Sequence, residues 1–362
     1  MTPTLFSVLS LAVSAQEIVL GQSAAISGPA QELGKEMRLG ASLYFERVNA
    51  DGGVRGKRVV LRTMDDGYEA DRAAANTQKM VADGDIHAFF GYVGTPTSLP
   101  SLKIATEARI PFFGAFTGAQ ALRDPFNRYV FNVRASYFDE TEAIVRQMTQ
   151  SGATKIAVFY QNDSYGQAGL AGVERALLKR DLKVFARGTV ERNSIDVKAA
   201  VDAMFAVKPE VIVMISAYSS CAEFIKQAKA RGIATQFVNV SFVGTHALAK
   251  ALGPAADGVL ISQVMPPPTA KKYAIVREYL TAIEAAKVEP SYTSLEGFVA
   301  AKIMVEALKR GGDASREALV KALESMRNYD VGGLNISFSP ENHNASKFVE
   351  LTVLGRDGKV RY

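Results

Sequence analysis

The sequence predicts an α/β protein with two doubly wound, parallel sheets, each covered by helices on both faces. Short apolar runs alternate with helical patterns from Glu17 onward, as in such folds. A chain of 362 residues is longer than the chains that usually fold around a single hydrophobic core, so two domains are expected. Four helix-capping signals, at residues 117–120, 139–142, 164–167 and 220–223, place helix N-termini near strand ends. Because such termini favour anions, the pattern predicts a ligand cleft.

The first series of elements is expected to complete one α/β layer. Apolar residues recur at helical spacing from Leu33 to Val48, and the segment from Asn49 to Gly53 ends that helix. Strands are expected at residues 18–26, 59–64, 86–93 and 110–116, and helices at residues 33–48, 70–82 and 99–108.

A second series has its own complement of strands and is expected to build a separate sheet. It begins after a strand expected at residues 129–133, and its own strands are expected at residues 155–160, 183–190, 211–215, 236–240 and 258–264. Its helices are expected at residues 140–150, 166–179, 197–207, 221–230 and 246–252.

The three prolines after Met265 cannot continue a central strand or a helix, so they are interpreted as a linker. Three helical patterns and a hairpin follow, and the hairpin turns at Asp357-Gly358. These helices are expected at 271–286, 295–310 and 316–325, and the hairpin strands at 349–354 and 359–362. Helices that follow a completed sheet are expected to return to the first domain. The predicted lobes are therefore interleaved, with 17–134 and 267–333 in the first and 135–266 and 334–362 in the second.

Composition excludes several classes of protein. Hydrophobic residues make up 48%, charged residues 22%, and the mean hydropathy is +0.04, which excludes a mostly disordered chain and a polytopic membrane protein. The formal charge of +5 is spread along the chain, so no nucleic-acid partner is expected. The apolar run at residues 5–13 is too short to span a bilayer and precedes small residues, which predicts a secretory signal within residues 1–16 and an exported protein. The alternative is a frayed terminal segment.

Motifs for catalysis and metal binding are not found. Cys221 is the only cysteine, and the three histidines lack metal-ligand spacing, so no metal or cofactor is expected. The sequence has no nucleophile elbow and no phosphate-binding or dinucleotide-binding glycine loop. A binding protein is therefore favoured over an enzyme, although an enzyme with carboxylates outside any recognised motif stays an alternative.

Loops at the carboxyl ends of the predicted strands supply the candidate ligand contacts. Thr95 and Thr97 follow one strand and Thr117 follows the next, where hydroxyl and backbone donors favour a carboxylate. The alternative is that these threonines only cap helices. On the other lobe, Tyr165 and Tyr218 are expected to cover the ligand, although each is equally typical of a packing residue. Ser241 is expected to complete that wall.

Five segments, at residues 26–29, 48–57, 65–66, 91–98 and 163–166, resemble the leucine/isoleucine/valine-binding protein family. Those proteins are periplasmic amino-acid-binding components of ATP-driven (ABC) transporters. The resemblance implies the type I periplasmic-binding fold, in which two Rossmann-like lobes are joined by three hinge crossings. It also implies a monomer that delivers a free amino acid to an inner-membrane permease.

The resemblance also implies roles for individual residues. Thr95 is similar to the carboxylate-binding serine of the family, and Phe116, Thr117 and Gly118 match the segment that binds the ligand carboxylate and ammonium. Tyr165 and Tyr218 match the tyrosines of the second lobe. The acidic residue that often meets the ammonium is replaced by Ser241, and its candidate substitutes are Asp139 and Glu296.

The expected ligand is therefore an aliphatic, branched amino acid such as leucine, isoleucine or valine. The alternative is a module on the same fold that senses or takes up an amide, urea or an aromatic acid.

Overall fold

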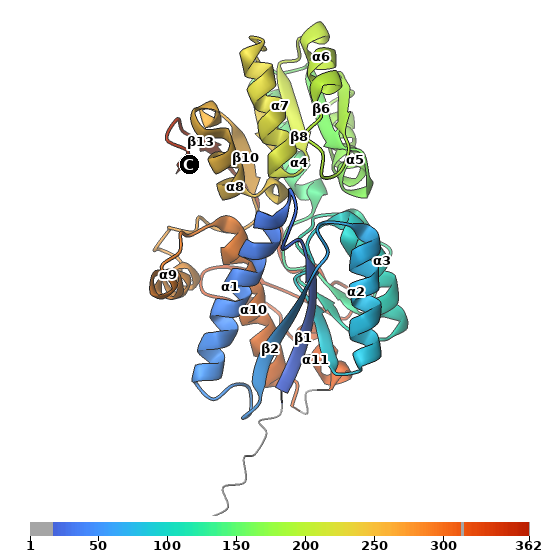
Figure 1. The fold of residues 1–362 in the computed structure, drawn as a ribbon, viewed down its shortest axis with the longest axis vertical. Coiled ribbons are helices and arrows are strands. Elements are labelled where there is room, and N and C mark those ends of the chain that lie inside the picture. The colour runs from blue at the N-terminus through green and yellow to red at the C-terminus, as the bar shows by residue number, and fades with distance from the viewer. Residues whose placement is uncertain (1–16, 313–314, 362) are drawn as a thin grey trace, which may run out of the picture.

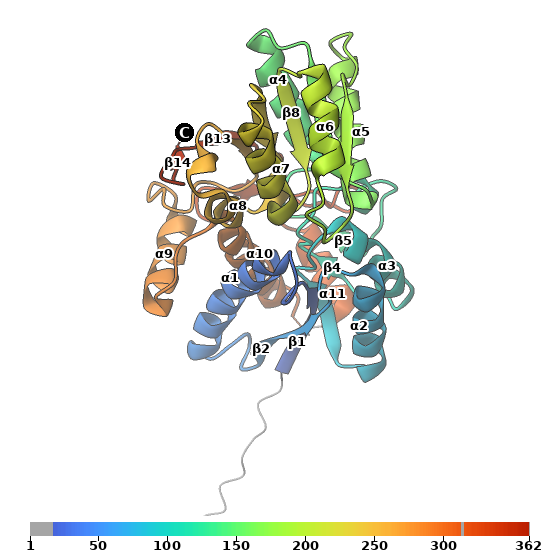
Figure 2. The same cartoon turned by 45° about the horizontal axis from the view of Figure 1, so that its top comes forward.

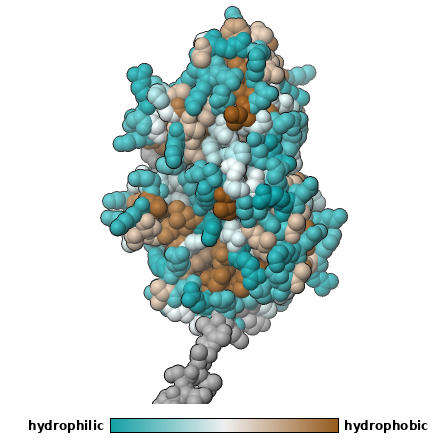
Figure 3. Space-filling view, viewed as in Figure 1, coloured by the Kyte–Doolittle hydropathy of each residue, from teal (hydrophilic) through white to brown (hydrophobic). Residues whose placement is uncertain are grey.

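A computed structural model describes residues 17–312 and 315–361, and it shows two α/β lobes stacked one above the other (Figure 1). The predicted fold class is confirmed. Polar side chains cover most of the face in Figure 3, with small apolar patches scattered among them.

The first lobe is built on a five-stranded parallel sheet in the order β2-β1-β3-β4-β5. Its strands are β1 (Glu17–Ala24), β2 (Arg58–Asp65), β3 (Ile86–Phe90), β4 (Phe112–Phe113) and β5 (Val130–Phe131). Its helices are α1 (Gln31–Ala50), α2 (Ala70–Asp83), α3 (Thr95–Glu107), α9 (Ala274–Ala286), α10 (Tyr292–Arg310) and α11 (Arg316–Glu324). The strand order reverses between β1 and β3, which is where α/β sheets bind ligands.

The second lobe is built on a seven-stranded sheet in the order β14-β13-β10-β9-β8-β6-β7, in which β13 pairs antiparallel with both of its neighbours, β10 and β14. Its strands are β6 (Ile156–Gln161), β7 (Arg187–Val190), β8 (Val211–Ile215), β9 (Gln236–Asn239), β10 (Leu260–Gln263), β13 (Glu350–Leu354) and β14 (Val360–Arg361). Its helices are α4 (Tyr137–Gln150), α5 (Ser164–Leu178), α6 (Lys198–Val207), α7 (Tyr218–Ala230) and α8 (Thr245–Leu252). The strand order reverses between β6 and β8.

Three chain crossings join the lobes: between β5 and α4, between β10 and α9, and before β13 (Figure 2). The expected boundary before the third crossing, at residue 334, is wrong. β11 (Tyr329–Asp330) and β12 (Asn335–Ile336) pair with each other, and Phe338 packs its ring against Phe113 and Phe131 of the first lobe. The chain therefore crosses only between this segment and β13.

Residues 49–54, with the pattern Asn-x-x-Gly-Gly-Val, belong to one of the five segments and have a structural role that explains their distinct sequence. The Asn49 side chain donates to the Val59 carbonyl and accepts from the Val59 N–H, both at 2.8 Å, which ties the end of α1 to β2. Gly53 has φ +75°, and a Cβ there would lie 2.1 Å from the Lys57 carbonyl oxygen. Only glycine fits this turn.

Helices α4, α5 and α7 begin close to three of the predicted capping signals, but the residues at their cap positions differ from those predicted. Helix α4 is capped by Ser136, whose hydroxyl accepts from the Asp139 N–H, so Asp139 lies in the first turn. Helix α5 is capped by Asp163 rather than Ser164, and α7 begins at Tyr218 with no side-chain cap. The signal at Thr117 is followed only by a short 3-10 turn, Gln120–Leu122.

Candidate ligand-binding cleft

The loops at the two points of strand reversal face each other across the space between the lobes. Tyr68, which follows β2, accepts a hydrogen bond of 3.3 Å from Gln161 at the end of β6. A Cβ on Gly244 of the second lobe would lie 2.4 Å from the Leu33 side chain of the first. The lobes are therefore closed on each other.

Thr95 and Thr117 lie together at the carboxyl end of the first sheet. Their hydroxyls are 2.7 Å apart, both side chains are buried, and Thr117 also accepts from the Ala119 N–H at 3.2 Å. Thr95 opens α3, four residues before the expected helix start, so its hydroxyl shares the site with the free N–H groups of a helix N-terminus. This pair can hold a carboxylate.

The structure gives Thr97 and Gly118 supporting roles. The Thr97 hydroxyl donates to the backbone carbonyls of Val93 and Gly94 one turn earlier, so its proton is already used. A Cβ on Gly118 would lie 2.5 Å from the Tyr137 ring, and the Gly118 carbonyl accepts from the Tyr137 N–H at 2.7 Å. Glycine at this position lets Tyr137 approach Thr117, which donates to the Tyr137 hydroxyl at 3.3 Å.

Aromatic rings form the wall opposite the threonines. The Tyr165 ring lies 4.5 Å from Phe242 and 5.5 Å from Tyr137, and Phe242 lies 5.4 Å from Phe116 of the other lobe. Tyr165 is fully buried, and its hydroxyl has no hydrogen-bond partner among the described residues. Burial raises the pKa of Tyr165 well above its usual value, so the phenol stays neutral and can donate to a ligand.

Tyr218 lies at the start of α7 and is half-buried between the lobes. Burial raises the pKa of the Tyr218 phenol. A hydrogen bond with the backbone of Glu32, at the start of α1, opposes this shift but does not cancel it. Tyr218 therefore contacts the first lobe, as expected for a residue that lies over a closed cleft.

Ser241 is held by a buried carboxylate that the sequence did not single out. Glu140 accepts from the Ser241 N–H at 2.8 Å, from the Ser241 hydroxyl at 3.1 Å and from the Ser262 hydroxyl at 2.6 Å. Burial raises the pKa of Glu140, while nearby Arg134 and these donors oppose the shift. Its hydrogen-bonding capacity is used within the protein.

Arg134 and Glu296 form a buried ion pair beside Ser241. Arg134 Nε lies 2.9 Å from Glu296 Oε1, and Nη2 donates to Oε2 at 3.0 Å, with the two side chains 1% and 4% exposed. The guanidinium carbon lies 4.3 Å from the centroid of the Phe116 ring. Burial opposes the charge of Arg134, but Glu296 and Glu140 outweigh it and raise the pKa of the guanidinium.

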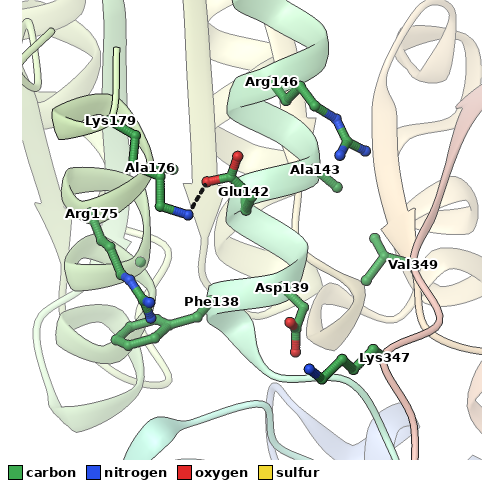
Figure 4. Close-up of a pocket in the computed structure, with 11 residues that line it drawn as sticks. Phe138, Asp139, Glu142, Ala143, Arg146, Arg175, Ala176, Lys179, Lys347 and Val349 are labelled. Atoms are coloured by element: carbon green, nitrogen blue, oxygen red, sulfur yellow. Dashed lines mark hydrogen bonds and ion pairs between the residues drawn. The ribbon is translucent and has the colours of Figure 1, made fainter. Parts of the chain in front are cut away.

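Asp139 does not join this cluster, contrary to the expectation that it faces a ligand ammonium. Its carboxylate accepts from the Ser136 N–H at 2.9 Å, and it lines a separate pocket of about 300 Å³ beside Lys347 (Figure 4). The other candidate, Glu296, lies at the cleft but is paired with Arg134.

The sequence of residues 17–359 matches the model of the family described as "Periplasmic binding protein". This chain belongs to that family. It is 24% identical to Leu/Ile/Val-binding protein homolog 7 of Brucella abortus, over 96% of this chain and 92% of the relative. It is 23% identical to the leucine-specific-binding protein of Salmonella typhimurium, over 88% and 87% of the two chains. A possible leucine/isoleucine/valine-binding protein from Rhodopirellula baltica has a crystal structure that superimposes with a TM-score of 0.93 at 35% identity, covering 97% of both chains.

Periplasmic binding proteins bind substrates and are not enzymes, as expected here from the motifs. Within residues 17–312 and 315–361, no helix is both long and apolar enough to cross a bilayer. The same described residues contain no cluster of three or more His, Cys, Asp and Glu side chains suited to a metal ion.

Polar contacts across the mouth of this periplasmic binding protein stabilise the closed form. Asn193 of the second lobe donates to the Gly67 carbonyl at 3.0 Å and to Glu69 at 2.7 Å, and Arg192 donates to Glu69 at 3.0 Å. None of these hydrogen bonds involves Thr95 or Thr117.

We expect Asn193→Ala to weaken ligand binding about five-fold, mainly through faster dissociation, because it destabilises the closed form. Stopped-flow fluorescence measures the dissociation rate. Asn162→Ala is the matched control, since Asn162 donates to Glu191 within the same lobe. Equal dissociation rates for wild type and Asn193→Ala would contradict the role given to this contact.

Sequence reasoning missed Arg134, Glu140 and the rings of Tyr137 and Phe242. A weak signal existed for two of them. Glu140 falls at helical spacing with the buried Ile144 and Met148, and Arg134 follows an apolar strand directly. Charged residues are usually exposed, so neither pattern by itself predicts burial.

Proposed function

We propose that this chain is the periplasmic solute-binding component of an ABC transporter. It encloses a small carboxylic acid of amino-acid size between its lobes as a monomer and delivers it to the inner-membrane permease. Leucine, isoleucine and valine, for which its relatives are named, are the first candidates. The observation that carries the proposal is the buried Thr95–Thr117 hydroxyl pair beside the N-terminus of α3, opposite Tyr165 in a closed cleft.

The permease would recognise the closed form. A ligand that contacts both lobes favours that form by its differential affinity for the closed and open states, and no bond is made or broken. Thr95 and Thr117 belong to the first lobe and Tyr165 to the second, so one carboxylic acid between them can provide this bias.

A second candidate is a ligand without an ammonium group, such as an aromatic acid or an amide. The supporting observation is that Glu140, which holds Ser241, and Glu296, which holds Arg134, are already paired within the protein. Calorimetric titration of the protein with amino acids, carboxylic acids and amides separates the two candidates.

We expect Thr117→Val to weaken binding of the carboxylate ligand about ten- to hundred-fold, because a hydrogen bond to a charged group is lost while the side-chain shape is kept. Thr97→Val is the matched control, since the Thr97 hydroxyl donates to backbone carbonyls. Isothermal titration calorimetry measures both affinities. Equal losses in the two variants would argue against a carboxylate at the Thr95–Thr117 pair.

A further inference from the structure

Arg134 has donor groups that the protein leaves unused. Its Nη2 donates to Glu296 and to the Ser241 hydroxyl, each at 3.0 Å, and its Nε faces Glu296. Nη1 has no hydrogen-bond partner among the described residues, although Arg134 is only 1% exposed. An unpaired buried donor is costly, and the cost is larger when the group is charged. A group that accepts from Nη1 would remove this cost.

Arg134 also lines a small cavity between the lobes. Its volume is about 10 Å³, which is space for roughly one oxygen atom or one water molecule. The residues around it come from both lobes and from the second crossing: Phe116, Arg134, Ser241, Gln263, Val264, Met265, Tyr292, Thr293 and Glu296. The cavity thus suits a single polar atom rather than a branched aliphatic chain.

Phe116 links this cavity to the threonine pair of the first lobe. The Phe116 ring, which stacks on the Arg134 guanidinium, belongs to the residue directly before Thr117. Thr117 in turn donates to the hydroxyl of Tyr137, three residues beyond Arg134. A ligand whose carboxylate meets Thr95 and Thr117 therefore needs only a short extension to reach Arg134.

The local charges favour an oxygen over an ammonium at this point. Glu296 is paired with Arg134, and Glu140 is saturated by the Ser241 and Ser262 donors. An ammonium beside Arg134 would meet a like charge in a buried site, with no carboxylate free to balance it.

We propose that Arg134 is a specificity-determining residue whose Nη1 donates to a second oxygen of the ligand. The ligand is then a carboxylic acid that carries an oxo, hydroxyl or second carboxylate group and has no ammonium. This inference rests on the proposed function, because it assumes that the cleft binds a carboxylate.

The test compares three acids of one carbon skeleton by calorimetric titration of the ligand-free wild-type protein. They are 4-methyl-2-oxopentanoate, 4-methylpentanoate and L-leucine. The oxo acid is expected to bind about ten- to hundred-fold more tightly than the other two. If leucine or 4-methylpentanoate binds as tightly as the tightest-binding oxygen-bearing acid of this arm and the next, the inference is overturned and the proposed function stands. If a screen of other carboxylic acids also finds no ligand, both fail.

Hydroxy acids and dicarboxylic acids of similar length form the second arm of the titration, and they identify which oxygen group Arg134 prefers. If leucine binds more tightly than every oxygen-bearing acid in both arms, the inference is wrong.

Arg134→Lys tests the residue itself, because it keeps the charge but removes the planar donor group. We expect the preference for the oxygen-bearing acid to fall to within about three-fold, while affinity for the unsubstituted acid changes little. If Arg134 had a purely structural role, the substitution would weaken binding of both acids equally and leave the ratio of their affinities unchanged. That result would overturn the assignment. Arg146→Lys, at an exposed position in the separate pocket, is the matched control. The wild-type comparison stands by itself if Arg134→Lys does not fold.

Discussion

Replacing Glu296 by leucine is expected to lower the free energy of unfolding by about 3–5 kcal/mol, because it leaves the guanidinium of Arg134 buried without its main partner. The pair is almost fully buried, at 1% and 4% exposure, so solvent screens it little. Urea denaturation of the purified protein measures the change. The substitution removes a charge from the centre of the interlobe contact, and both lobes are expected to lose stability together.

A surface pair provides the matched comparison. Arg128 and Glu317 form an ion pair whose side chains are 42% and 49% exposed, and Glu317→Leu is expected to change stability by less than about 1 kcal/mol. The double variant Arg134→Met with Glu296→Leu is expected to recover part of the loss, because an apolar pair leaves no unbalanced charge. A Glu296→Leu protein as stable as wild type would show that Arg134 does not depend on this carboxylate.

Gly40→Ala is expected to destabilise the first lobe by about 3 kcal/mol, because the α1 and α10 backbones touch at this glycine. A Cβ on Gly40 would lie 1.7 Å from the Ser294 carbonyl oxygen, and one on Gly297 of α10 would lie 2.2 Å from the Met37 carbonyl oxygen. Neither carbonyl can move without shifting a helix. Since α10 carries Glu296, the same change is expected to weaken ligand binding.

Thermal and urea denaturation measure this effect, and Gly311→Ala is its control. Gly311 caps α10 in an ordinary right-handed conformation, and its nearest neighbours would be 3.3 Å from a new Cβ. We expect that substitution to change stability by no more than about 1 kcal/mol. If Gly40→Ala is as mild as Gly311→Ala, the two helices are not in backbone contact.

The alternation of strands and helices was predictable because local patterns determine it. Strand β8 begins and ends where the apolar run of Val211 to Ile215 does. Helix starts were less accurate, since a Ser, Thr or Asp in the first turn resembles a cap. The signal at Asp139 is an example, because Ser136 caps that helix and Asp139 occupies its third position.

Long-range contacts account for most of what could not be predicted. The sequence alone places the segment around Phe338 in the second lobe, whereas its packing on Phe113 and Phe131 assigns it to the first lobe. Likewise, Arg134 and Glu296 are 162 residues apart, and no local pattern indicates that they form a pair. The threonine pair was found because both residues follow strands whose ends meet at one sheet edge.

The central claim is that a carboxylate ligand closes the two lobes on each other, and spin-label distance measurement tests it most directly. Labels are placed at exposed Gln78 on α2 and Ala199 on α6 in a background in which the buried Cys221 is replaced by alanine. With the tightest-binding acid at saturation, we predict a shorter and narrower distance distribution that matches the closed structure. Identical distributions with and without that ligand would contradict the claim.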